Sequence, residues 1–205
     1  MYRGSCNSAL DLSWKRKVYR REFVILWLSL IITGLSQYAR AQSVADEYQV
    51  KAAFLFHFAQ FVDWPPGVLT DSDSSLTLCV FDDEPRRQEL QSTIEGKAIG
   101  PRVLHIRQVS QSQAIQGCNI LFLSREESHR QTAILKSLRG MPVLTVGETD
   151  NFLSDGGMIR FHLDANRIRF DINLDGAESS HLKISSRLLL LATSVTQGST
   201  ANRGR

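Results

Sequence analysis

The stretch DGGMIRFHLDANRIRFDINLD, which runs from Asp155 to Asp175, decides the fold. Apolar and polar residues alternate along each of its two halves, and a polar turn at residues 164–167 separates the halves. Alternation with a period of two is typical of a β-strand, so two such runs joined by a short polar turn predict an antiparallel hairpin. Gly156 and Gly157 precede the first strand and permit a sharp entry into it.

The turn sets the register of this hairpin. If it closes on Ala165 and Asn166, one face carries two apolar pairs, Phe161–Phe170 and Ile159–Ile172. An apolar face packs on a core, whereas the opposite, charged face contacts water. We consider two interpretations of the charged face: it is the ordinary solvated edge of a sheet, or it receives a ligand or partner. Its residues are Arg160 opposite Asp171, His162 opposite Arg169, and Asn173.

Upstream of the hairpin, predicted strands and helices alternate. Strands are expected at 76–81, 102–109, 118–123 and 143–146. Helices are expected from Asp83 through at least Leu90, from a capping box at Ser124 and Glu127 through Leu138, and from Ser185 to about Val195. This alternation predicts one α/β domain, with a mostly parallel sheet flanked by helices and the antiparallel hairpin near its C-terminus.

An unusually apolar helix is expected before the first strand. It begins with a capping-box pattern at Asp46 and Gln49, and the sequence Trp64-Pro65-Pro66-Gly67 ends it. Apolar side chains surround it and leave only Lys51, His57, Gln60 and Asp63 as a polar remainder. Such a helix is either buried in the core or shared with another chain. The residues predicted for a dimer or partner surface are Phe54, Phe56, Phe58, Phe61 and Trp64.

The N-terminal 41 residues have the pattern of a secretory signal peptide behind a basic extension. A basic cluster at 15–21 precedes an apolar run at 23–35 and a small-x-small site at 39–41. An uncleaved anchor is the alternative, although the run is short for a membrane span. Residues 42–196 are then the folded domain, and the polar stretch 197–205 is expected to be disordered.

Removal of this leader changes the charge balance. The whole chain has 24 basic and 21 acidic residues; the leader takes seven and two of them, which leaves 17 and 19. The mature chain is therefore slightly acidic, and its charge gives no reason to expect nucleic acid as a partner. Two cysteines remain after cleavage, Cys79 and Cys118. An even number in an exported chain favours a disulfide, and two buried thiols are the alternative.

Familiar catalytic and metal-binding patterns are absent from the sequence. It has no phosphate-binding loop, no nucleophile elbow and no His or Cys spacing typical of a metal site. We therefore predict no enzyme activity, no cofactor, no metal and no catalytic residue. A small-anion seat is one interpretation of the start of the last predicted helix, and plain capping by its first serine is the other. The seat would consist of Lys183, Ser185, Ser186 and Arg187.

Three blocks carry a resemblance to a known family. They are EYQVKAAFLFHFAQFVDWP at 47–65, GCNILFLS at 117–124, and GGMIRFHLDANRIRFDINLD at 156–175 followed by LKISSRLLLLA at 182–192. In order and spacing they resemble the YfiR family of periplasmic repressor proteins. The resemblance covers nearly all of residues 42–196 and implies an α/β domain in the periplasm that often forms a dimer.

The resemblance also implies partners and a redox link. In the best-known case the repressor contacts the periplasmic segment of an inner-membrane GGDEF diguanylate cyclase and suppresses cyclic di-GMP synthesis, and an OmpA-like outer-membrane lipoprotein relieves that repression. Disulfides in that system tie the repressor's stability and activity to redox state. Cys79 and Cys118 look like one such pair, whereas a second pair found in some relatives has no counterpart here. The alternative function is a periplasmic sensor of a small ligand without a cyclase partner.

Overall fold

The computed structural model describes residues 47–69, 75–81, 84–110 and 115–198. The predicted signal peptide and residues 199–205 of the predicted tail lie outside these ranges. Within them, no helix is both long and apolar enough to cross a membrane.

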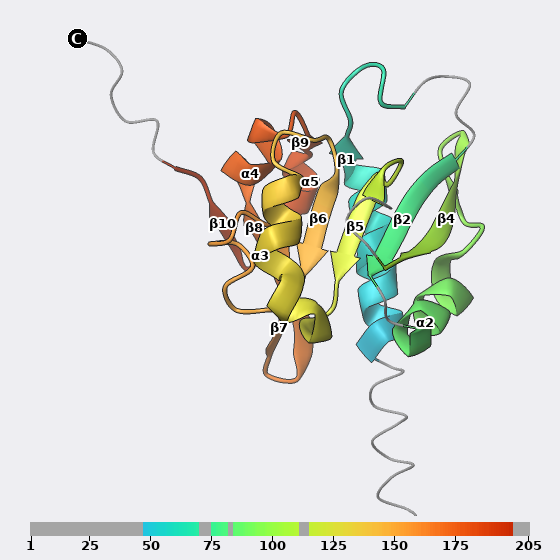
Figure 1. Ribbon diagram of the computed structural model, residues 1–205, viewed down its shortest axis with the longest axis horizontal. Coiled ribbons are helices and arrows are strands. Elements are labelled where there is room, and N and C mark those ends of the chain that lie inside the picture. Colours follow the sequence, from blue (N-terminus) through green and yellow to red (C-terminus); the bar gives the residue numbers. More distant parts are fainter. Residues whose placement is uncertain (1–46, 70–74, 82–83, 111–114, 199–205) are drawn as a thin grey trace, which may run out of the picture. The chain divides into compact units, whose positions relative to one another are not determined.

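An eight-stranded, mostly parallel sheet forms the centre of the domain (Figure 1), in the order β10-β8-β7-β6-β5-β2-β4-β3. The inner pairs from β4 to β7 are parallel, as is β8 with β10, while β3–β4 and β7–β8 are antiparallel. This arrangement confirms the predicted fold class. The strands are β2 (Ser75–Phe81), β3 (Ala98–Ile99), β4 (Arg102–Val109), β5 (Ile120–Leu123), β6 (Leu144–Gly147), β7 (Ile159–Asp164), β8 (Arg167–Asn173) and β10 (Ser194–Thr196).

The hairpin of β7 and β8 has the predicted register. Phe161 lies opposite Phe170, and Arg160 lies opposite Asp171. Ala165 and Asn166 form the turn with φ angles of 45° and 60°. Positive φ at both central residues is the mark of a two-residue turn whose twist matches that of the strands. The local alternation of side chains was therefore sufficient to predict this pairing.

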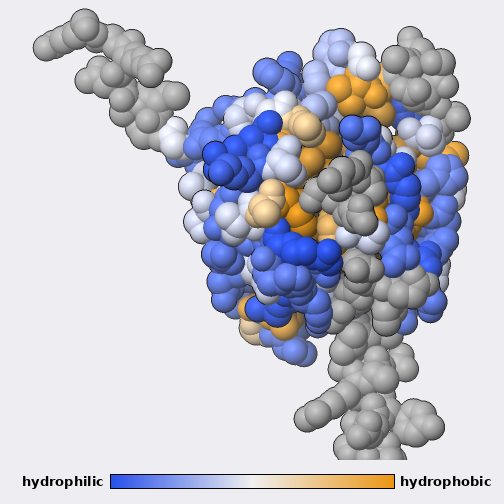
Figure 2. All heavy atoms as spheres, in the orientation of Figure 1, coloured by the Kyte–Doolittle hydropathy of each residue, from blue (hydrophilic) through white to orange (hydrophobic). Residues whose placement is uncertain are grey.

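Helices cover both faces of the sheet. They are the N-terminal helix (residues 47–61), α2 (Glu84–Ile94), α3 (Ser128–Ser137), α4 (Leu174–Ser179) and α5 (Ser186–Leu189). Successive strand residues point to opposite faces, and the buried apolar residues accordingly form two clusters. The larger cluster contains the N-terminal helix, and the smaller one contains α3. Viewed from the α3 side, most of the surface is hydrophilic, with apolar patches between (Figure 2).

The smaller cluster contains the predicted disulfide. Cys79 on β2 is bonded to Cys118, which lies two residues before β5. Phe152 belongs to the same cluster and is fully buried, with its ring between Gly147 and Gly157. A Cβ atom on either glycine would lie 2.2 Å from that ring, so the close packing requires glycine at both positions.

A second, two-stranded sheet joins distant parts of the chain. The segment after the N-terminal helix forms β1 (Val62–Asp63), which pairs antiparallel with β9 (Lys183–Ile184). The backbone N–H of Ser185 also donates to the carbonyl of Phe61 at 2.9 Å. Neither short strand was predicted, because two residues carry no periodicity.

Two helix predictions were wrong in part. Ser124 does not cap a helix through its side chain, and a short 3-10 turn (Arg125–Glu127) precedes α3. The last helix is also much shorter than the predicted range, which extended to about Val195. It ends at Leu189, and the chain continues into β10, which pairs with β8. The β-branched residues Thr193, Val195 and Thr196 favour a strand there.

Candidate functional site

The carboxyl ends of β5 and β6 lie side by side, with Leu123 opposite Gly147. Arg125 follows β5 and Glu148 follows β6. Arg125 donates from its backbone N–H to Glu148 Oε2 at 3.2 Å, and its Nη2 donates to the carbonyl of Glu148 at 2.9 Å. Ligands of open α/β sheets bind at this edge, outside the carboxyl ends of the strands. A charged pair therefore occupies the place where a ligand site is expected.

Lys51 of the N-terminal helix reaches the same place. It is only 4% exposed, although the helix pattern placed it in the polar remainder. Its Nζ lies 2.5 Å from Glu148 Oε1 and also forms an ion pair with Glu47. Tyr48 donates its hydroxyl to the Glu148 carboxylate at 3.3 Å, and its ring centroid lies 4.3 Å from Lys51 Nζ. These partners compensate for the loss of hydration that burial of an ammonium group entails.

The polar face of the hairpin forms a second charged group nearby. Asp171 accepts from Arg160 Nη2 and from Ser194 Oγ, both at 2.7 Å. His162 Nδ1 lies 3.1 Å from Asp171 Oδ2, without the geometry of a hydrogen bond. The structure thus brings together three of the predicted residues, Arg160, His162 and Asp171, and adds Ser194 from β10.

The ionisation of Asp171 is set by these neighbours. Its burial disfavours the charged form, but the hydrogen bonds from Ser194 and Arg160, together with the charges of His162 and Arg160, outweigh that effect. The pKa of Asp171 is consequently lowered from its usual value. The carboxylate therefore stays charged at neutral pH although it is only 4% exposed.

A cavity of about 480 Å³ is lined by residues of the first charged group and by His162 of the second. The N-terminal helix and the strand ends contribute Glu47, Lys51, Arg125, Glu148 and Asp150, and the hairpin contributes Phe161, His162, Leu163 and Ile168. Charged groups on one side and apolar groups on the other suit a small molecule that carries both kinds of surface. No cluster of metal-ligating side chains was found among the described residues.

The remaining predicted hairpin residues have other positions. Asn173 caps α4, because its side chain accepts from the backbone N–H of Gly176 at 3.0 Å and donates to the carbonyl of Gly157 at 3.1 Å. Arg169 is exposed and does not line the cavity. The cavity therefore uses the half of the hairpin next to the turn, with three residues of β7 and Ile168 of β8.

The predicted anion seat lies around α5. Ser185 caps this helix, since its Oγ accepts from the backbone N–H of Leu188 at 3.4 Å. Lys183, Ser186 and Arg187 are exposed. The cap agrees with the interpretation of plain capping, and a helix of four residues has only a weak dipole to attract an anion.

The predicted partner surface needs one correction. Phe58 is fully buried and packs on Phe161 and Phe170, so it belongs to the core of the monomer. Four of the predicted residues, Phe54, Phe56, Phe61 and Trp64, are partly buried against the same core. Their remaining exposure leaves them available for contact with a partner.

One stripe of the N-terminal helix runs along the border between its buried and its exposed face, since two of its members are partly buried and two are exposed. Val50, Phe54, His57 and Phe61 follow one another at spacings of three and four residues, which place them along one side of a helix. Val50 is 45% exposed, and the His57 ring stacks on Phe61 with centroids 6.2 Å apart. We call these four residues the helix stripe. The sequence placed Val50 in the apolar pattern of this helix and His57 in its polar remainder, but periodicity alone did not show that both are exposed.

Comparison with known structures finds two similar chains, of which the first supports the fold. A conserved domain protein from Vibrio cholerae O1 biovar El Tor is 11% identical, with a TM-score of 0.50, over 71% of this chain and 60% of its own. The chain thus spans about three fifths of that protein. A domain from Streptococcus pneumoniae, solved with L-Trp, is 9% identical with a TM-score of 0.42, over 59% of this chain and 55% of its own.

Comparison with protein families gives a more specific result. The pattern of the YfiR/HmsC-like family matches residues 48–193. This range contains the disulfide, the whole helix stripe, and both charged groups and the cavity lining apart from Glu47 and Ser194. The match covers well over half of the chain and begins and ends close to the limits of the folded domain. The chain belongs to the YfiR/HmsC-like family.

Proposed function

We propose that this protein binds the periplasmic segment of an inner-membrane GGDEF diguanylate cyclase and represses cyclic di-GMP synthesis. Family membership carries the proposal, since proteins of this family are periplasmic regulators connected with diguanylate cyclases. Repression by binding requires that the protein bind the inactive state of the cyclase more tightly than the active state. The homodimer and the OmpA-like lipoprotein partner stay predictions that the family resemblance implies.

The helix stripe is our proposed contact surface. Apolar and aromatic side chains that a monomer leaves partly exposed favour a protein partner, because association removes them from water. Val50 is 45% exposed, and its neighbours Phe54 and Phe61 are anchored on the core. A rigid helix carrying partly buried aromatic residues presents a preorganised surface, which reduces the entropy lost on binding.

A measurement of cyclic di-GMP in cells tests the function. Deletion of the gene should raise the cyclic di-GMP content, and an exported copy of the wild-type protein should restore it. The same copy without residues 1–41 should fail to restore it, because the protein would not reach the periplasm. An unchanged cyclic di-GMP content in the deletion strain would refute the proposed repression.

A charge on the helix stripe tests the surface separately. Val50→Glu should leave the fold intact, since Val50 is already half exposed, but should abolish restoration by the exported copy. Ala133→Glu is the matched control, because it places the same charge on an exposed position of α3, on the opposite face of the sheet. Full restoration by both variants would show that the contact surface lies elsewhere on the molecule, and the proposed function would still stand.

The cavity favours a second candidate function, the sensing of a small ligand. Its volume of about 480 Å³ is sufficient for a small molecule, and its lining is both charged and apolar. A ligand that binds the native state raises the melting temperature. We would screen nucleotides and aromatic amino acids by thermal shift and repeat each hit with Arg125→Gln, which alters the cavity wall. A shift that persists unchanged in this variant would exclude the cavity as the binding site.

A further inference from the structure

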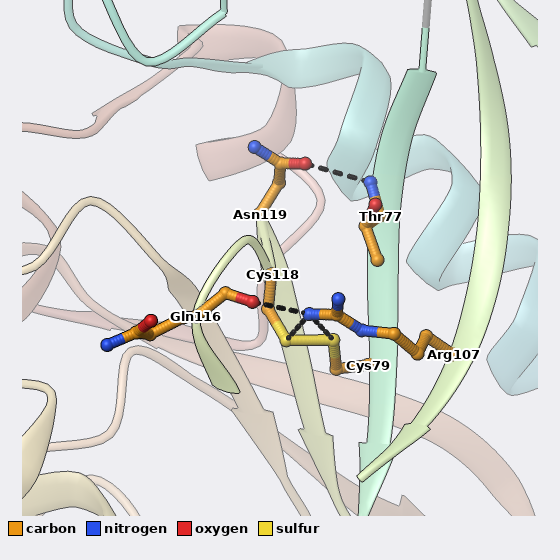
Figure 3. The surroundings of a disulfide bond; sticks show 6 residues. All are labelled: Thr77, Cys79, Arg107, Gln116, Cys118 and Asn119. Atoms are coloured by element: carbon orange, nitrogen blue, oxygen red, sulfur yellow. Dashed lines mark hydrogen bonds between the residues drawn. A yellow bond between two sulfur atoms is a disulfide. The ribbon is translucent and has the colours of Figure 1, made fainter. Parts of the chain in front are cut away.

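Arg107 of β4 lies directly beside the disulfide (Figure 3). Its Nη2 is 3.3 Å from Cys118 Sγ and 3.6 Å from Cys79 Sγ. The same nitrogen donates to the backbone carbonyl of Gln116 at 2.6 Å, which holds the guanidinium group over the sulfur atoms. A permanent positive charge is thus fixed at contact distance from both ends of the bond.

The two cysteines differ in their surroundings. Cys79 is fully buried, whereas Cys118 is 5% exposed and lines a cavity of about 540 Å³. That cavity is mostly apolar and lies at the amino ends of β5 and β6, between the segment 115–119 and the end of α3. A thiolate must approach a disulfide sulfur along the S–S axis, from the side away from the leaving sulfur. The cavity provides space beside Cys118, and Cys79 does not line it.

We propose that this disulfide exchanges with an external dithiol through Cys118, and that Arg107 stabilises the thiolate that leaves. The thiolate of the dithiol attacks Cys118 Sγ, a new bond forms between these two sulfur atoms, and the Cys79–Cys118 bond breaks. The electron pair of the broken bond goes to Cys79 Sγ, which becomes a thiolate 3.6 Å from Arg107 Nη2. The second thiol of the dithiol then releases Cys118 and completes the reduction.

The charge of Arg107 should accelerate the first step. A thiolate leaves faster when its conjugate thiol is more acidic, and a neighbouring cation increases that acidity. Arg107 is exposed, so its interaction with the thiolate is screened by water. Two unit charges about 4 Å apart in water attract one another by an amount equivalent to roughly a fivefold change in rate.

The test follows reduction of the native protein by dithiothreitol, with alkylation and mass spectrometry to count free thiols. Arg107→Gln should slow reduction about fivefold through loss of the charge, and Arg107→Lys should keep a rate close to wild type. Arg167→Gln, an exposed charge removed at the hairpin turn, is the matched control and should not change the rate. If Arg107 acted only as a structural clamp, Arg107→Gln would loosen the loop and accelerate reduction. Faster or unchanged reduction would overturn the proposal.

Identification of the attacked sulfur is an independent test. Brief treatment with a monothiol such as 2-mercaptoethanol, followed by acid quenching and peptide mapping, traps the mixed disulfide. The adduct should be found on Cys118 and the free thiol at Cys79. An adduct mainly on Cys79 would show that the cavity is not the route of attack.

Discussion

Asp171 connects three neighbouring strands through its side chain. Arg160 on β7 and Ser194 on β10 both donate to it, while the residue itself lies on β8. Because its pKa is lowered in the folded state, the charged form contributes stability. That contribution is fully present above the unfolded-state pKa of about 4 and disappears as the pH falls through the lowered folded-state pKa.

Replacement of this carboxylate gives a pH-dependent prediction. Asp171→Asn should reduce the free energy of unfolding by about 2 kcal/mol at pH 7, because hydrogen bonds to a buried charge are lost. The difference from wild type should diminish at the most acidic pH at which the wild type remains folded. Urea denaturation of both proteins at pH 7 and at that acidic pH measures this difference. Asp150→Asn is the control, since Asp150 has a side-chain exposure of 89%. An equal loss of unfolding free energy in both variants would contradict a specific stabilising role of the Asp171 carboxylate.

The position of some single residues could not be predicted from the sequence. Lys51 was expected to be solvated, since lysine is rarely buried, and its partner Glu148 is 97 residues away along the chain. Nothing within a local window indicates such a pair. The hairpin pairs Phe161–Phe170 and Arg160–Asp171 were predictable because both partners lie in one short segment with a clear period.

At the scale of elements, the leucine-rich run of α5 illustrates a different error. Its composition favours a helix as far as about Val195, but the helix ends at Leu189 and the next segment pairs with the edge of the sheet. Leu190 and Leu191 are consequently 85% and 62% exposed. Tertiary pairing has overridden local propensity here. The expected side-chain cap at Ser124 is also absent.

Two substitutions, at positions two residues apart, test this end of α5. Leu188 is 1% exposed and Leu190 is 85% exposed. Leu188→Ala should therefore reduce the free energy of unfolding by about 2–5 kcal/mol, whereas Leu190→Ala should change it by less than about 0.5 kcal/mol. Chemical denaturation of both variants gives the comparison. Similar losses at the two positions would mean that the helix continues and that Leu190 is buried.

On the scale of the whole molecule, the disulfide joins the central strand β2 to the segment that leads into β5. It closes a loop with a sequence separation of 39 residues. A loop of that length restricts the unfolded chain, and the chain-entropy estimate of the resulting stabilisation is about 4 kcal/mol. The effect belongs to the entire domain, because it acts on the unfolded state rather than on one contact.

Reduction should accordingly lower the free energy of unfolding by up to about 4 kcal/mol. We would compare urea denaturation with and without a reducing agent, under conditions in which thiol counting shows complete reduction. The variant Cys79→Ala/Cys118→Ala is the control and should be insensitive to the reducing agent. Equal stability of the oxidised and reduced wild-type proteins would indicate that the reduced unfolded chain already retains structure in this loop.

The pairing of β1 with β9 has a consequence for the order in which the protein becomes complete. A ribosome makes Val62 long before it makes its partner Ile184, and almost the whole domain lies between them. Contacts between residues so far apart form late, since a large loop must close first. The N-terminal helix therefore gains its last partner only after nearly all of the chain has been synthesised. Folding of this domain should therefore follow its synthesis rather than accompany it.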